Sequence, residues 1–167
     1  MLQYLKRKVF WRTVMKKIEL RIAKEGDEKI INDFFDSLSG ETRALFNRRD
    51  YNRRGIIKYL LKPDDTRRYY IFEEGGVMLG YVFLLDYDTT IPTLGIALRD
   101  EYQGKKLGEK MVSFLQEKMI EENKGGLQLT THVANLRAQA LYEKMGFVCM
   151  GVCKNGSELF YLWRYRK

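Results

Sequence analysis

Residues 93–133 combine a short strand, a loop, a long helix and a second strand, and this passage constrains the fold more than any other part of the chain. Residues 93–98 and 127–133 are short, mostly apolar runs, as buried strands require. The helix between them carries its apolar side chains on one face: Leu107, Met111, Val112, Leu115 and Met119. Because a strand–helix–strand connection is almost always right-handed, we expect two parallel neighbouring strands in one sheet.

Hairpins are predicted on both sides of this crossover. Residues 68–74 and 77–86 have strand composition and are joined through Gly75 and Gly76. Residues 147–154 and 157–166 are joined across a strong turn dipeptide, Asn155–Gly156. Strands joined in this way pair antiparallel, so the sheet is expected to be mixed.

The N-terminal part adds a strand and helices. Residues 18–22 alternate in polarity like a half-buried strand. A helix is expected after Asp27, and an interrupted helical stretch over residues 41–61. The predicted fold is therefore α/β, with a mixed, mostly antiparallel sheet of about seven strands, helices on both faces and one parallel strand–helix–strand crossover.

The composition is that of one globular domain. The chain has 167 residues, of which 45% are hydrophobic and 31% charged, as in an ordinary folded protein. No apolar run approaches the roughly 20 residues that a membrane span needs, and the basic N-terminus lacks the apolar core of a secretory signal. We therefore expect a soluble, cytoplasmic protein that does not bind membranes. The net charge of +8 suits an anionic partner: nucleic acid, a membrane surface or a phosphate-rich cofactor. No recognised motif supports the alternative of a nucleic-acid-binding protein.

The domain is expected to cover residues 15–167, because Met15 directly precedes the first strand pattern. Residues 1–14 are an extension of uncertain role, and three alternatives stay open: an added strand or helix, a tag for a membrane surface or a partner, or an upstream start. Cys149 and Cys153 are too few for a metal cluster. On one strand they are also too far apart to bridge, so we expect buried thiols and no metal.

The loop that precedes the long helix has the features of an anion site. It contains Gly104 and Gly108 and carries the positive charges of Lys105 and Lys106. Amides in the first turn of a helix point outward at the positive end of the helix dipole, and glycine lets a phosphate approach the backbone. The spacing of these glycines does not match the dinucleotide fingerprint. The loop is therefore a candidate anion site, and the alternative is an ordinary strand-to-helix turn, which also uses glycine.

Two segments together resemble one known family. Residues 103–108, Gln-Gly-Lys-Lys-Leu-Gly, are similar to the Q/R-x-x-G-x-G/A signature of the GNAT superfamily of N-acetyltransferases. Residues 135–147 resemble the family's second characteristic stretch and end in L-Y-x-K-x-G-F. The order of elements is also similar, so the resemblance covers nearly the whole chain. It implies an enzyme that passes the acetyl group of acetyl-coenzyme A (acetyl-CoA) to a primary amine by direct attack in a ternary complex.

The resemblance also implies which residues hold the donor. The backbone of Ile96, Ala97 and Leu98 would pair with the pantetheine arm, in a slot opened where this strand splays from residues 127–133. Asn135 and Ala138 would lie beside the pantetheine. The diphosphate would be held by the loop, whose implied binding residues are Gln103, Gly104, Lys105, Lys106, Leu107 and Gly108.

Tyr142 occupies the position from which many family members protonate the departing thiolate. A phenol of pKa near 10 can serve a thiol of pKa about 8.5; the alternative is that Tyr142 only packs on the apolar face of its helix. No base is implied in the same way, because the strand that often carries a glutamate has Thr93, Gly95 and Ala97 here. Asp86 and His132 are the candidates for a base or a proton route through water.

The acceptor side is less defined. Phe46 and Tyr51 fall in the region that, by resemblance, shapes the acceptor pocket, and Asp88 is a further candidate for binding a cationic acceptor. The family's middle glycine is Lys106 here, and we expect its ammonium to swing outward and assist the diphosphate. A non-catalytic module that senses acyl-CoA is the alternative function. The final hairpin is a candidate surface for a homodimer.

Overall fold

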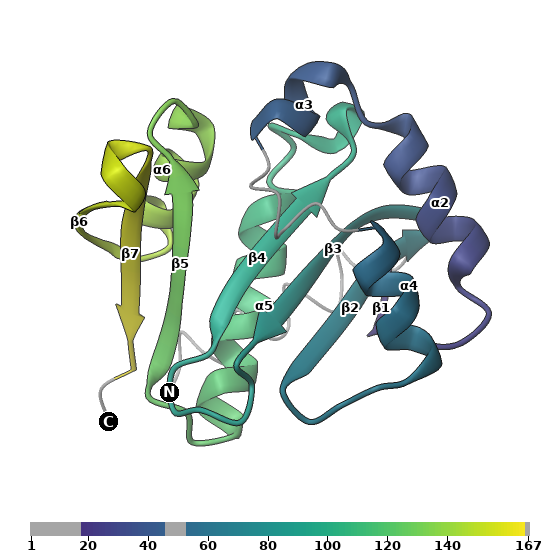
Figure 1. Cartoon of the computed structure of the whole chain (residues 1–167), viewed down its shortest axis with the longest axis horizontal. Coiled ribbons are helices and arrows are strands. Elements are labelled where there is room, and N and C mark those ends of the chain that lie inside the picture. Colours follow the sequence, from purple (N-terminus) through teal and green to yellow (C-terminus); the bar gives the residue numbers. More distant parts are fainter. Residues whose placement is uncertain (1–17, 46–52, 166–167) are drawn as a thin grey trace.

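A seven-stranded sheet runs through the molecule in the order β1-β2-β3-β4-β5-β7-β6 (Figure 1). The computed structural model describes residues 18–45 and 53–165, so residues 1–14, the boundary at Met15, Phe46 and Tyr51 lie outside the described part of the chain. The strands are β1 (Glu19–Ile22), β2 (Arg67–Glu74), β3 (Val77–Leu85), β4 (Thr93–Leu98), β5 (Gly126–His132), β6 (Val148–Cys153) and β7 (Glu158–Arg164). β4 and β5 pair parallel and every other pair is antiparallel. The predicted mixed, mostly antiparallel sheet with one crossover is confirmed.

Helices cover both faces of this sheet, as expected. The described helices are α2 (Glu28–Ser37), α3 (Gly40–Leu45), α4 (Arg53–Leu61), α5 (Leu107–Glu121) and α6 (Leu136–Lys144), with short 3-10 turns η1 (Asp100–Tyr102) and η2 (Lys154–Gly156). Figure 1 shows α2 and α4 on one face, here called the α2 face, and α5 behind the sheet on the other, here called the α5 face. The connection from β4 through α5 to β5 is the crossover that the sequence predicted.

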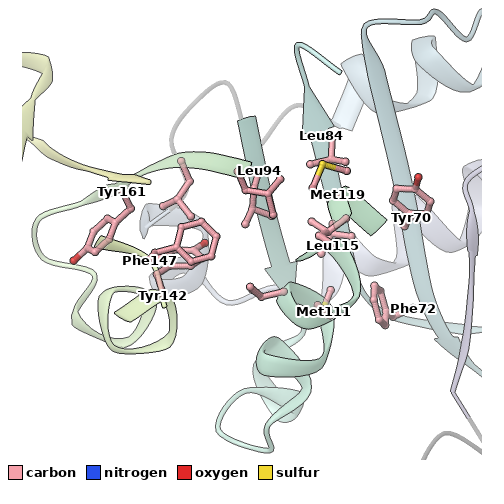
Figure 2. Close-up of a cluster of buried hydrophobic side chains, with 14 of the residues drawn as sticks. Tyr70, Phe72, Leu84, Leu94, Met111, Leu115, Met119, Tyr142, Phe147 and Tyr161 are labelled. Atoms are coloured by element: carbon pink, nitrogen blue, oxygen red, sulfur yellow. The ribbon is translucent and has the colours of Figure 1, made fainter. Parts of the chain in front are cut away.

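Each face has its own apolar core. On the α5 face, Met111, Leu115 and Met119 are fully buried against side chains of β2 to β5 (Figure 2). On the α2 face, Phe34 and Phe35 pack against Tyr81 with ring centroids 5.6 and 5.9 Å away. The central strand β3 is buried on both faces and reads as a continuous apolar run for that reason.

β4 and β5 separate shortly after they meet. Thr93 lies opposite Gln128 in the ladder between these strands, and the Gln128 side-chain amide lies 3.3 Å from the Thr93 hydroxyl, which places both side chains on the same face. Beyond this point the strands splay apart, as the resemblance implied. The gap positions the site described below.

β6 forms an edge of the sheet, and its side chains are largely open to solvent. Val148, Met150 and Val152 are exposed, Cys149 is exposed and Cys153 is half-buried. The expectation of two buried thiols is therefore wrong. An edge position depends on strand order, which the local sequence of β6 does not encode.

Candidate active site

A cavity of about 360 Å³ opens where β4 and β5 splay apart. This volume is within the usual range for small-molecule sites. Its lining includes most of the predicted donor-binding residues: Ile96, Ala97, Leu98, Gln103, Gly104, Lys106, Gly108, Asn135, Ala138 and Tyr142. His132 also lines it. The structure thus brings the two resembling segments, which are distant in sequence, to one opening.

Other predicted residues lie outside this lining. The Lys105 ammonium lies over the Tyr102 ring, 5.5 Å from its centroid, and Leu107 is buried in the core of the α5 face. Asp86 is exposed in a turn, where its carboxylate accepts a hydrogen bond of 3.2 Å from the Thr93 hydroxyl. Asp88 is exposed in the same turn.

The loop before α5 contains two residues with left-handed backbone. Gly104 has φ 72°, and a Cβ added there would meet no atom within 4 Å. Lys106 has φ 62° and precedes the first residue of α5. Glycine adopts this conformation freely, whereas an L side chain costs about 1–2 kcal/mol there. The lysine found in place of the family's glycine is therefore accommodated at a cost, with its side chain exposed.

Gly108 has a packing role in addition to its place at the loop. A Cβ at this position would lie 3.1 Å from Cδ2 of Leu141 in α6. Absence of a side chain therefore lets the first turn of α5 lie close to α6. The close approach of two helices is thus one physical reason for glycine at this position of the resembling motif.

The N-terminus of α6 meets the same opening. Asn135 caps this helix, because its side-chain oxygen accepts a hydrogen bond of 3.2 Å from the Ala138 amide. Arg137 donates to the side-chain oxygen of Gln103 and so connects the two helix starts. At the same end of the cavity the Lys144 ammonium lies 2.7 Å from a Glu109 carboxylate oxygen. Two helix N-termini with Arg137 and Lys106 favour an anion here, and this part of the cavity is called the anion-binding end below.

Tyr142 lies at the wall of the cavity and in the core at once. It is 5% exposed and packs against Phe147 and Tyr161, with ring centroids 5.6 and 6.1 Å away (Figure 2). Tyr142 therefore packs on the apolar face of α6, and the same residue also lines the cavity. The two interpretations of Tyr142 made from the sequence are compatible.

A hydrogen-bond network connects α3 to the loop before α5. The Asp100 carboxylate accepts from the Ser39 amide at 2.9 Å and from the Ser39 and Thr42 hydroxyls. The Gln103 amide lies 3.3 Å from the Thr42 hydroxyl. Burial raises the pKa of Asp100, but the hydrogen bonds from Thr42 and Ser39 outweigh it and hold this pKa below its usual value. Thr42 and Leu45 of α3 also line the cavity.

One wall of the cavity is formed by β5 and β7. His132 is exposed, and its Nδ1 accepts a hydrogen bond of 3.1 Å from the Ala134 amide. Opposite His132 in the ladder is Glu158, which also lines the cavity and is 7% exposed. Sequence reasoning missed Glu158, Arg137 and Lys144. An acidic residue at the start of a mostly apolar final strand was the one local signal for Glu158.

Comparison with known proteins places the chain in a family. The chain belongs to the acetyltransferase (GNAT) family, whose model matches residues 31–147. The expected superfamily is therefore confirmed, and so is the enzyme class, an N-acetyltransferase, at the level of the family. No described helix has the length and apolar character needed to cross a bilayer.

Individual relatives agree with this assignment. A candidate ribosomal-protein-bS18-alanine N-acetyltransferase of Bacillus subtilis (strain 168) is 31% identical over 102 residues, which is 57% of this chain and 66%, just under two thirds, of that protein. The ribosomal-protein-S5-alanine acetyltransferase of Vibrio fischeri superimposes with a TM-score of 0.76 at 18% identity, covering 89% of this chain and 93% of the other. The PaiA N-acetyltransferase of Thermoplasma acidophilum, solved with coenzyme A, gives 0.73 at 18% identity over 89% and 99%. These two structures confirm the fold.

Proposed function

We propose that this protein transfers the acetyl group of acetyl-CoA to the α-amine at the N-terminus of a protein chain, by direct attack in a ternary complex. The observation that carries the proposal is the cavity at the β4–β5 splay, which brings the loop before α5 and Tyr142 together. Membership of the GNAT family supports the type of reaction. The names of the Bacillus subtilis and Vibrio fischeri relatives, which specify alanine of ribosomal proteins, support the class of acceptor.

The residues at the opening fit the chemistry of acetyl-CoA. The backbone at residues 103–108, Lys106 and Arg137 would hold the diphosphate at the anion-binding end. The edge of β4 at residues 96–98, which faces β5 beyond the splay, would pair with the amide groups of the pantetheine arm. Asn135 and Ala138 would flank that arm. The donor supplies a thioester, whose carbonyl carbon is open to attack by an amine.

Tyr142 is proposed as the general acid that protonates the thiolate as the carbon–sulfur bond breaks. Cys149 and Cys153 lie on the edge strand β6 and not in the cavity lining, which favours direct attack over a covalent acyl-enzyme. His132 stays a candidate for the proton route because it lines the cavity. Asp86 would act only through Thr93, to which it is hydrogen-bonded.

The function is tested by incubating the protein with acetyl-CoA and a short synthetic peptide that begins with alanine. We expect release of free thiol that depends on the peptide, and acetylation of the peptide's α-amine in a mass spectrum. Matched acceptors are the same peptide with a blocked N-terminus and an internal lysine, and the polyamine spermidine. Faster reaction with either of these would overturn the proposed acceptor while leaving the acetyl transfer intact.

The second candidate function is a non-catalytic module that binds acyl-CoA. Two observations favour it: the strained Lys106 in the loop, and the absence of a carboxylate side chain from the described strand β4. Such a module would bind acetyl-CoA in a calorimetric titration and release no thiol with any amine. That outcome would replace the enzymatic proposal.

A homodimer and a cytoplasmic location complete the proposal. Val148, Met150 and Val152 give the edge strand β6 an exposed apolar surface, and exposed strand edges tend to pair with other chains. Light scattering coupled to size exclusion tests the dimer, with Val152→Lys expected to shift the protein to a monomer. The location is supported by the ribosomal acceptors named for the relatives.

A further inference from the structure

On the α2 face, the sheet surface beside the cavity carries a carboxylate side chain on β7, that of Glu158, and none on β4. On β4 this surface consists of Thr93, Gly95 and Ala97, since alternate residues of a strand share a face. The Phe83 ring already fills the space beside Gly95, where an added Cβ would lie 1.8 Å from the ring. A carboxylate therefore has no room at that position of β4.

Glu158 lies on the same face of the sheet, two strands away. Thr93 and Gln128 share this face through their side-chain contact, so Thr130 and His132 of β5 share it too. Directly paired residues of neighbouring strands point to one side, and Glu158 pairs with His132. Glu158 is thus placed beside the open part of the splay, and it contributes to the cavity lining.

The described lining contains two carboxylates, Glu109 and Glu158. Glu109 lies in the first turn of α5, at the anion-binding end, and is paired with Lys144. Glu158 extends from the α2 face of the sheet, on the side opposite α5. The two carboxylates therefore reach the cavity from different faces of the sheet, and Glu158 is the one placed to meet an amine that approaches from the α2 face.

The surroundings of Glu158 already accommodate a primary ammonium. The Lys154 Nζ lies 2.6 Å from a Glu158 carboxylate oxygen and 3.4 Å from the Thr130 hydroxyl. The Lys154 side chain is 43% exposed and reaches this point from η2 at the surface. It offsets the cost of burying the carboxylate. Glu158 and Thr130 both line the cavity, so an ammonium group that enters from within would meet the same carboxylate and hydroxyl side chains.

We propose that Glu158 binds the ammonium of the acceptor and takes its proton, which makes it the general base of the acetyl transfer. This inference rests on the proposed function. The ammonium gives one proton to Glu158, and the neutral nitrogen forms the new carbon–nitrogen bond while the carbon–sulfur bond breaks. The Tyr142 phenol gives its proton to the departing thiolate and regains one from the acylated nitrogen. The proton on Glu158 then leaves to solvent.

The test compares Glu158→Gln with the wild-type protein, with the alanine peptide as acceptor. At neutral pH we expect kcat to fall about 100-fold, as for loss of a general base, and the Kd for acetyl-CoA to stay within twofold. At about pH 9.5, well above the roughly 8 of a free α-amine, solvent deprotonates the acceptor and the deficit should shrink to a few-fold. Charged or titratable groups facing Glu158 in the described structure are Lys154 from η2, His132 from β5 and Cys153 from β6.

A matched variant separates catalysis from the ion pair. Lys154→Met removes the same pair with Lys154 but leaves the carboxylate, so a purely structural role predicts equal losses of activity and melting temperature in both variants. We expect Lys154→Met to keep kcat within about fivefold of wild type. Equal losses, or a deficit of Glu158→Gln that does not change with pH, would overturn the role of Glu158 while the proposed function stands. Failure of the wild type to release thiol with any amine would overturn both.

Discussion

The two ends of the cavity are built in different ways. The anion-binding end uses the backbone of residues 103–108 and the helix starts at Leu107 and Leu136, all close to recognisable motifs. The proposed acceptor side is lined by side chains from α3, β5 and β7, which are far apart in the sequence. Backbone amides bind an anion wherever a suitable turn and helix occur, whereas a side-chain site depends on topology. The first kind is visible in a sequence and the second becomes visible only in the fold.

Apart from changes at Glu158, Tyr142→Phe is the single substitution expected to have the largest effect. The ring still packs against Phe147 and Tyr161, so folding and the Kd for acetyl-CoA should not change. Loss of the acid lowers kcat by about 100-fold. Steady-state kinetics with the alanine peptide measures this. A variant with wild-type kcat would show that Tyr142 serves only in packing. The cavity would then lack its proposed general acid.

Asp100→Asn tests whether the hydrogen-bond network around Asp100 holds α3 against the loop before α5. Removing the charge weakens the hydrogen bonds from Ser39 and Thr42, and we expect a loss of about 2 kcal/mol in unfolding free energy near neutral pH. The pKa of Asp100 is lowered in the folded protein, so the wild-type carboxylate stabilises above its unfolded pKa of about 3.9. That contribution is lost as pH falls through the folded pKa.

Urea unfolding of both proteins at several pH values measures this contribution. The difference between wild type and Asp100→Asn should be full above about pH 5 and shrink at lower pH. A difference that is independent of pH would mean that the Asp100 charge does not stabilise the link between α3 and the loop.

Arg137→Met is expected to weaken acetyl-CoA binding by about tenfold, which corresponds to about 1.4 kcal/mol. Arg137 lines the anion-binding end and connects it to Gln103. The control is Arg164→Met, which removes the same charge at the end of β7 opposite Glu158. This variant should bind acetyl-CoA like wild type. Calorimetry at two salt concentrations measures both. Equal weakening in the two variants would point to the net charge of the protein rather than to a built site.

Lys106→Gly is expected to have the smallest effect, a gain of about 1 kcal/mol in stability. Glycine relieves the left-handed backbone at this position. Lys106→Met is the matched control, because it removes the charge and keeps the strain, so its melting temperature should equal that of wild type. Stabilisation by both variants would assign the effect to charge repulsion with neighbouring lysines instead.

The fold was predictable because its signals are local. Alternation marked β1, the glycine pair and Asn155–Gly156 marked the hairpins, and the apolar stripe that includes Met111 and Leu115 marked α5. Exposure of Cys149 was not predictable, because it follows from the edge position of β6. The position of Glu158 in the cavity lining was equally unpredictable from the sequence, because it depends on the register of β7 against β5. At the anion-binding end, the motif residues predicted most of the cavity lining, and the structure added Arg137.

Calorimetric titration of Gly104→Asp against Gly104→Asn tests most directly whether the loop before α5 holds the diphosphate of acetyl-CoA. Asn and Asp both tolerate the left-handed backbone at this position, and they differ only in charge. We expect wild type and Gly104→Asn to bind acetyl-CoA one to one with similar affinity, and Gly104→Asp to bind at least tenfold more weakly. Equal binding by the two variants, or no binding by the wild type, would contradict the account.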